Sequence, residues 1–142
     1  MEQPKTESRI MGIDYGEKRI GIALSDPLLT FAYPLVTLSN SNMVINEIGK
    51  IISEKNVVKV ILGMPSLKFV SSERLAEKIH KLKKEIEIRL KTEVILWDEE
   101  YSSAIAKEKV NESVTKKSKR QKKELLDQHS AAIILQEYLD SN

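Results

Sequence analysis

Apolar residues alternate with polar or small residues in three short runs near the start of the chain. Residues 9–15 and 19–24 form two of these runs, on either side of a turn at 16–18 that contains glycine, and residues 33–38 form the third. Alternation with a period of two is typical of strands, and a short turn with glycine between two such runs indicates a β-hairpin. The pattern therefore predicts three consecutive antiparallel strands.

Helical periodicity follows and then alternates with buried strands. Residues 57–62 and 93–97 are short apolar runs rich in β-branched residues, which is typical of buried parallel strands. Apolar stripes with helical spacing predict helices that begin near Val44, near Ser71 and near Lys122. The sequence thus switches from consecutive strands to alternating helices and strands.

Three further segments complete this interpretation. Polar residues 39–42 are expected to cap the first long helix. Residues 102–110 are expected to form a short helix, and residues 111–121, which show no apolar period, a loop. No internal repeat or linker divides the chain, so we expect one domain over residues 1–142, with a flexible N-terminus at 1–8.

The order of the elements predicts an α/β fold. Short turns make the first three strands antiparallel, whereas strands separated by helices become parallel through right-handed crossovers. We therefore expect a five-stranded mixed sheet with helices on both faces.

Composition excludes several classes of protein. The 142 residues are 41% hydrophobic and 31% charged, which is typical of a folded globular protein. The absence of cysteine excludes disulfides, a cysteine nucleophile and a thiolate zinc site. No apolar run approaches the roughly 20 residues that a membrane helix needs, and the first ten residues lack the apolar stretch of a signal peptide. We expect a cytoplasmic protein without a membrane partner.

Basic residues are concentrated in one segment. Residues 105–123 contain eight basic and two acidic residues, a local charge of +6, so the overall charge of +2 leaves −4 for the rest. Such a segment is either an ordinary solvated loop or a surface that contacts a polyanion, and we favour the polyanion. The residues expected to bind nucleic acid there are Lys116, Lys117, Lys119, Arg120 and Lys122.

Acidic residues follow two of the predicted parallel strands. Asp14 ends the first strand, and Asp98 and Glu99 follow the last, so they are expected to meet at the edge of the sheet where α/β proteins bind ligands. Asp127 begins an apolar helical stripe, so it is expected to face the sheet although the stripe carries no lysine or arginine. A divalent cation, Mg²⁺ or Mn²⁺, shared by these carboxylates would satisfy them.

Each acid also has a simpler structural interpretation. Asp14 could bind the backbone of its glycine turn, and Asp98 and Glu99 could be solvated or cap the next helix. Asp127 could lie in the first turn of its helix because the helix dipole favours an anion there.

Four motifs, in order along the chain, resemble those of the YqgF/RuvX family. They are Ile13-Asp14-Tyr15-Gly16-Glu17-Lys18-Arg19-Ile20-Gly21-Ile22-Ala23, Gly63-Met64-Pro65, Asp98-Glu99-Glu100-Tyr101-Ser102-Ser103, and Asp127-Gln128-His129-Ser130-Ala131-Ala132 with Ile134-Leu135-Gln136. The resemblance implies a ribonuclease H-like fold related to the resolvase RuvC. It also implies that Asp14, Glu99 and Asp127 are catalytic acids, with Asp98 as a further metal ligand.

The implied function is that of a metal-dependent nuclease for structured nucleic acid, most simply one that matures the 5′ end of precursor 16S rRNA. The alternatives are a Holliday junction resolvase and a weakly catalytic RNA-binding factor for ribosome assembly. Glu100 replaces the family's arginine, and no glycine follows Pro65 at the family's position. Lys18, Arg19 or Lys68 would then supply the positive charge that faces phosphate.

Overall fold

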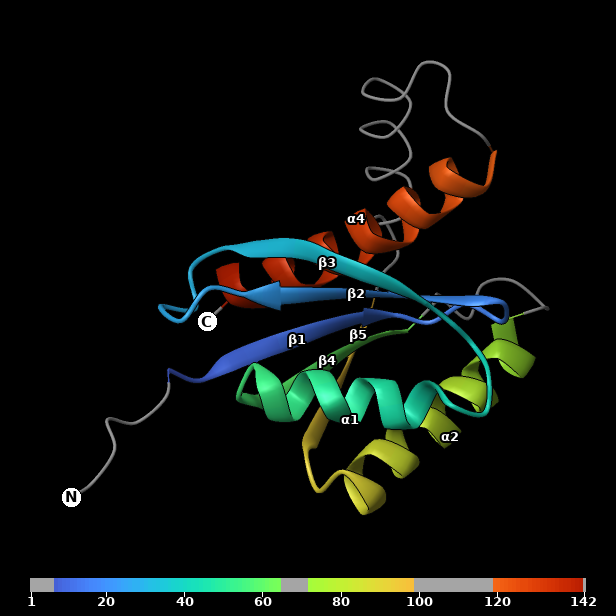
Figure 1. Cartoon of the computed structure of the whole chain (residues 1–142), viewed down its shortest axis with the longest axis horizontal. Coiled ribbons are helices and arrows are strands. Elements are labelled where there is room, and N and C mark those ends of the chain that lie inside the picture. Colours follow the sequence, from blue (N-terminus) through green and yellow to red (C-terminus); the bar gives the residue numbers. More distant parts are fainter. Residues whose placement is uncertain (1–6, 65–71, 99–118, 142) are drawn as a thin grey trace.

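The computed structural model describes residues 7–64, 72–98 and 119–141 (Figure 1). The strands are β1 (Arg9–Asp14), β2 (Arg19–Ser25), β3 (Ala32–Ser39), β4 (Val57–Met64) and β5 (Glu93–Asp98). The helices are α1 (Val44–Glu54), α2 (Ser72–Arg89) and α4 (Lys119–Asp140). None of the helices in these ranges is both long enough and apolar enough to cross a membrane.

The five strands form one mixed sheet in the order β3-β2-β1-β4-β5. Strand β2 is antiparallel to both β1 and β3, whereas β4 is parallel to both β1 and β5. This arrangement confirms the predicted mixed sheet and places the carboxyl ends of β1, β4 and β5 at the same edge. The helix predicted over 102–110 lies outside the described residues.

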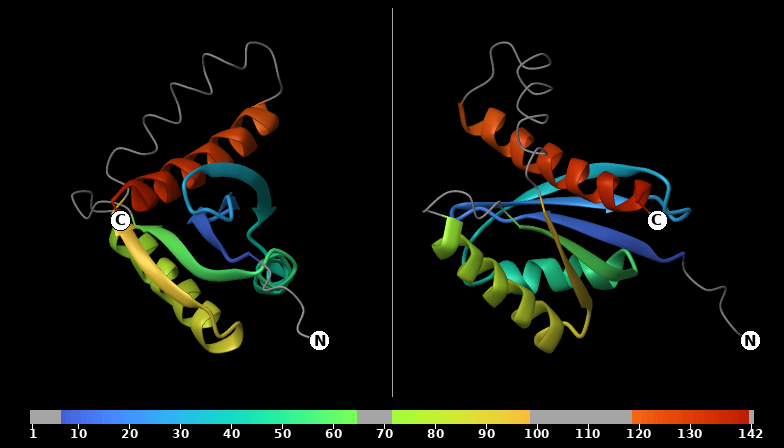
Figure 2. Two further views of the ribbon diagram at one scale, coloured as in Figure 1. Left: turned by 90° about the vertical axis from the view of Figure 1, so that its left-hand side faces the viewer. Right: turned by 180° about the vertical axis from the view of Figure 1, so that it is seen from behind.

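Helices cover both faces of the sheet, as predicted (Figure 2). Met11 and Ile13 of β1 point to the core beneath α1 and α2, which also contains Ile48 and Ile79. Ile10, on the opposite face, joins a second core. The residues of α4 in this second core are Ala131, Ala132, Ile134, Leu135 and Leu139.

Two glycines let α4 lie directly on the sheet. A Cβ atom at Gly12 would lie 2.7 Å from the carbonyl oxygen of Ala131 and 2.8 Å from the Cβ of Leu135. A Cβ atom at Gly21 would overlap the backbone carbonyl of Asp127. The helix therefore contacts β1 and β2 at a separation that only glycine permits at these positions.

Two local predictions were wrong. Helix α4 begins at Lys119, three residues before the expected start at Lys122. The N-cap of α1 is Met43, outside residues 39–42, and it makes no side-chain cap hydrogen bond. Within the described chain, Ser41 accepts only from the residues at the helix start, on Oγ from the backbone N–H of Met43 at 3.2 Å and on its carbonyl oxygen from that of Val44 at 3.1 Å. Asn40 instead donates from Nδ2 to the carbonyl oxygen of Gly16 at 2.8 Å, so this side chain fixes the β1–β2 turn.

Gly21→Ala should displace α4. Because the new methyl group would overlap backbone, we expect a destabilisation of roughly 3 kcal/mol, or a fall in Tm of about 6–12 °C. The matched control is Gly49→Ala in α1, where the methyl would meet only the flexible end of Leu90 at 2.8 Å. That control gains helix propensity and should change Tm by less than about 4 °C. Equal Tm values for the two variants in a thermal melt would contradict the close approach of α4.

Candidate active site

Asp14 and Asp127 meet on the face of the sheet that α4 covers. Asp14 follows Ile10 and Gly12 at the strand period of two, so its side chain lies on their face. Its cross-strand partner is Gly21, and the position of a Cβ atom at Gly21 is 3.0 Å from the Cβ of Asp127. Since Cβ atoms directly opposite each other on paired strands lie about 4.5–5.5 Å apart, the Cβ atoms of the two aspartates are separated by no more than about 8.5 Å. Two carboxylates at that separation can reach one ligand.

Arg19 pairs with Asp127. The Nε of Arg19 donates to Oδ2 of Asp127 at 2.9 Å, and the two side chains are 30% and 19% exposed. No lysine or arginine lies on the helical stripe of Asp127, as the sequence showed, and its basic partner comes instead from the start of β2.

The pKa of Asp127 is raised above its ordinary value. Burial of the carboxyl group between α4 and the sheet is the main cause of the raised pKa. The hydrogen bond from Arg19 and the charge of Arg19 act in the opposite direction. The nearby charge of Glu124 adds a smaller upward contribution. Arg19 therefore offsets the burial of this carboxylate only in part, so the site still favours additional positive charge.

Asp98 lies on the opposite face from Asp14 and Asp127. Along β5, Val94 and Leu96 pack into the core beneath α1 and α2, and Asp98 continues this alternation as an exposed residue. Strand β5 is two strands away from β1, roughly 10 Å in the hydrogen-bonding direction. The structure thus brings Asp14 and Asp127 together without Asp98, and Glu99 lies outside the described residues.

The chemistry of these side chains suits a hard divalent cation. Residues 7–64, 72–98 and 119–141 contain no cluster of three or more histidine or acidic side chains that could hold a metal. Mg²⁺, however, is often held by only one or two carboxylates, with water and substrate phosphate as its other ligands. Asp14 and the Oδ1 atom of Asp127 can supply such carboxylate oxygens. Ser130, one turn further along α4, adds a buried hydroxyl for which the described chain supplies no hydrogen-bond partner.

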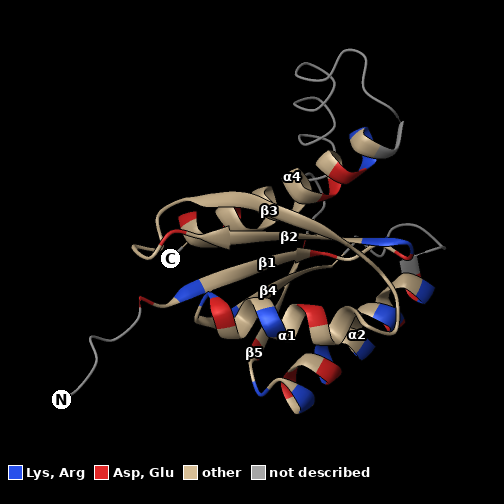
Figure 3. Ribbon diagram, viewed as in Figure 1, with Lys and Arg blue, Asp and Glu red and all other residues tan. Residues whose placement is uncertain are grey.

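Lysine and arginine residues lie at the start of β2 and near the start of α4 (Figure 3). Lys18 is exposed in the β1–β2 turn, beside Arg19. Lys119 and Arg120 belong to the first turn of α4, and Lys122 is exposed on the next turn. The remaining predicted contacts, Lys68, Lys116 and Lys117, lie outside the described residues.

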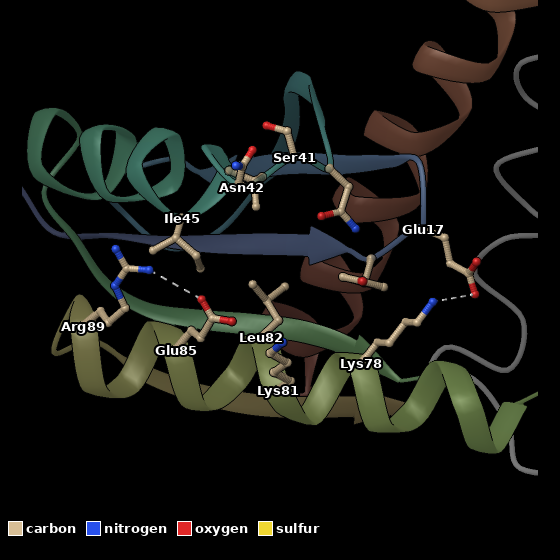
Figure 4. A pocket seen from close by; sticks show the side chains of 12 residues that line it. Glu17, Ser41, Asn42, Ile45, Lys78, Lys81, Leu82, Glu85 and Arg89 are labelled. Carbon is tan, nitrogen blue, oxygen red and sulfur yellow. Dashed lines mark ion pairs between the residues drawn. The ribbon is translucent and has the colours of Figure 1, made fainter.

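A pocket of about 560 Å³ opens on the other face of the sheet, between α1, α2 and the β1–β2 turn (Figure 4). Two of its cations are neutralised. Lys78 Nζ lies 3.4 Å from Glu17 Oε1, and Arg89 Nη1 lies 3.6 Å from Glu85 Oε2. The two aspartates are not among the residues that line this pocket, so it is not the candidate active site.

Comparisons with known proteins identify the family. A family model described as "RuvX: Holliday junction resolvase" matches residues 8–141. A relative from Desulforamulus reducens is 37% identical over 139 residues, covering 94% of this chain and 97% of its own. A relative from Acetivibrio thermocellus is 39% identical over 137 residues, covering 94% and 96%. Both are named "Putative pre-16S rRNA nuclease". The chain belongs to the RuvX family.

Solved structures show the same fold. RuvC of Thermus thermophilus in complex with a Holliday junction substrate is similar with a TM-score of 0.53 at 11% identity, covering 89% of this chain and 93% of RuvC. A second structure of this RuvC has a TM-score of 0.51 at 10% identity, with 94% and 95% coverage. The predicted ribonuclease H-like α/β fold is confirmed.

The raised pKa of Asp127 predicts a pH dependence of stability. The folded chain binds the proton of Asp127 more tightly than the unfolded chain does, because the folded pKa lies above the ordinary value. This contribution to stability is complete below about pH 4 and is lost as pH rises through the raised pKa. Asp127→Asn lacks this proton but keeps an oxygen that can accept the bond from Arg19. In metal-free buffer, the Tm of the wild type relative to that variant should fall as pH rises from about 4 to neutrality.

Thermal melts of both proteins across this range provide the measurement. A relative Tm that rises with pH would contradict this account, since it would mean that the attraction of Arg19 exceeds the effect of burial.

Proposed function

We propose that this chain is a metal-dependent endonuclease that matures the 5′ end of precursor 16S rRNA. The observation that carries the proposal is that Asp14, at the carboxyl end of β1, and Asp127 of α4 lie close together on the same face of the sheet. The names of the relatives, which the chain matches over nearly its whole length, support the substrate. Precursor rRNA as substrate would place the enzyme in the cytoplasm.

Within this proposal, Asp14, Glu99 and Asp127 are the catalytic acids that hold Mg²⁺ or Mn²⁺. This proposed ligand set omits Asp98, because continuing the alternation of Val94 and Leu96 along β5 favours the other face for its side chain. When bound, the cation would lower the pKa of the attacking water and stabilise the leaving oxygen. Asp14 would be held firmly in place, because it ends a buried strand paired on both sides.

The basic residues would hold the substrate backbone. Lys18 and Arg19 lie beside the acids, and the basic residues at the start of α4 would extend the contact away from them. Lysine and arginine contacts to phosphate orient a nucleic acid but do not read its sequence. The proposed enzyme would therefore recognise the structure of its RNA more than its bases.

Cleavage of a four-way DNA junction is the second candidate function. The description of the matching family and the fold shared with RuvC favour it. A third candidate, an RNA-binding assembly factor with little catalysis, rests on Glu100 in place of the family's arginine. Cleavage assays on precursor 16S rRNA and on a four-way junction, run side by side with Mg²⁺, separate the three.

Asp14→Asn should abolish cleavage of precursor rRNA. It removes one ligand charge with almost no change in volume, so the fold and the binding of RNA should stay nearly intact. Rates with Mg²⁺, together with RNA affinity in EDTA, provide the measurement. Cleavage at the wild-type rate by Asp14→Asn would refute the catalytic assignment.

Loss of the basic segment should flatten the salt dependence of binding. Each phosphate contact removed should lower the slope of log affinity against log salt by about 0.7 for single-stranded RNA. Glutamine is suitable as the replacement because it keeps helix propensity. The residues to replace are Lys116, Lys117, Lys119 and Arg120.

A control variant with the same change in charge replaces four exposed lysines on or beside α1 and α2, namely Lys50, Lys55, Lys84 and Lys91. Its slope should match that of the wild type. Equal slopes for both quadruple variants would show that the basic segment is merely solvated.

A further inference from the structure

A second, smaller pocket lies directly beside the ion pair of Arg19 and Asp127. It has a volume of about 280 Å³ and lies between the start of β2, the end of β3 and α4. Two cations, two hydroxyl groups and one carboxylate line it. The lining residues are Lys18, Arg19, Thr37, Leu38, Ser39 and Glu124.

The guanidinium group of Arg19 has hydrogen-bond donors available for a ligand in this pocket. Only its Nε is engaged, by Asp127 Oδ2, and its two terminal nitrogens bond to no residue in the described part of the chain. A guanidinium group carries five N–H donors in a planar fork, so it can hold a carboxylate on one edge and a phosphate on another. A lysine has no such second edge.

The walls of the pocket are held in place by hydrogen bonds. Asn40 donates from Nδ2 to the Gly16 carbonyl at 2.8 Å and from its backbone N–H to the Lys18 carbonyl at 2.9 Å. Thr37 donates from Oγ1 to the carbonyl oxygen of Glu124 at 2.7 Å, which joins β3 to α4. The turn that presents Lys18 and the helix opposite it are therefore already positioned for a ligand.

We propose that this pocket holds a backbone phosphate of the nucleic-acid substrate, next to the phosphate that is cleaved, and that Asp127 positions Arg19 for this contact. Arg19 and Lys18 donate to the phosphate oxygens. Oδ2 of Asp127 orients the guanidinium. This inference rests on the proposed function and identifies where its substrate is held.

The charge of the pocket favours a phosphodiester over free phosphate. Lys18 and Arg19 contribute two positive charges, and Glu124 removes one. The lining residues therefore carry a charge of +1, and the pairing of Arg19 with Asp127 lowers it further. So small a positive charge suits the single negative charge of a backbone phosphate better than the nearly double charge of a terminal phosphate group.

Binding of a short fluorescent single-stranded RNA in EDTA tests the pocket without any metal. Arg19→Gln should weaken binding about tenfold, the effect of losing one charge-assisted hydrogen-bonded contact. Arg19→Lys keeps the positive charge but lacks the planar fork of N–H donors, so its affinity for RNA should fall nearly as much as that of Arg19→Gln. Glu124→Gln should tighten binding, and Lys55→Gln, a distant exposed control, should not change it. Wild-type affinity in Arg19→Lys, with its Tm unchanged, would overturn the role of the fork.

A double-mutant cycle tests the positioning role of Asp127. If Asp127 orients Arg19, Asp127→Ala should weaken RNA binding in EDTA, and Arg19→Gln in the same chain should add little. Simple electrostatics gives the opposite sign, because removing a carboxylate strengthens the binding of a polyanion. Tighter binding by Asp127→Ala, or additive losses in the double variant, would overturn the proposal.

Two further measurements identify the ligand and separate this inference from the proposed function. Inorganic phosphate at the same concentration should not displace the RNA, and displacement that depends on Arg19 would indicate a site for free phosphate instead. Loss of RNA binding in Arg19→Gln without any metal-dependent cleavage by the wild type would leave the pocket standing and refute the nuclease. Metal-dependent cleavage by the wild type, together with unchanged RNA binding by Arg19→Gln, would refute the pocket and leave the nuclease standing.

Discussion

The arrangement of this protein depends on how closely α4 approaches the sheet. A helix that packs through ordinary side chains lies about 10 Å from the sheet, whereas Gly12 and Gly21 leave no side chain between α4 and the strands. The backbone of Asp127 consequently lies against Gly21, the cross-strand partner of Asp14. Two acids separated by more than a hundred residues in the chain therefore share one site, and a single methyl group at Gly21 would separate them.

The same close approach determines the electrostatics of the site. Packing α4 against the sheet removes much of the water around Asp127, and this burial raises its pKa. Arg19 reaches the carboxylate from the start of β2 and offsets part of that effect. What remains is a carboxylate that would gain from a further cation. A divalent metal held by the two carboxylates would supply that positive charge.

The elements could be predicted from the sequence because their patterns are local. The period of two in β1 and β2, and the apolar runs of β4 and β5, determined the sheet and its mixed topology. The meeting of Asp14 and Asp127 followed from a strand end and a helical stripe. The lack of a side-chain cap on α1 was not predictable in this way. The side chain of Asn40, a candidate cap, instead donates to the carbonyl oxygen of Gly16, a contact with a residue far from the helix in sequence.

Two features of the site differ in how far the sequence could indicate them. The position of Asp98 was available from the sequence, since the period that buries Val94 and Leu96 carries Asp98 to the face opposite α4. The partner of Asp127 was not available, because the contact with Arg19 joins residues 108 positions apart and depends on the depth at which α4 packs. Arginine at this position has a consequence that lysine would not have. Its fork can serve the carboxylate and a phosphate together, so one residue of β2 links the acid site to the surface where a nucleic-acid backbone would lie.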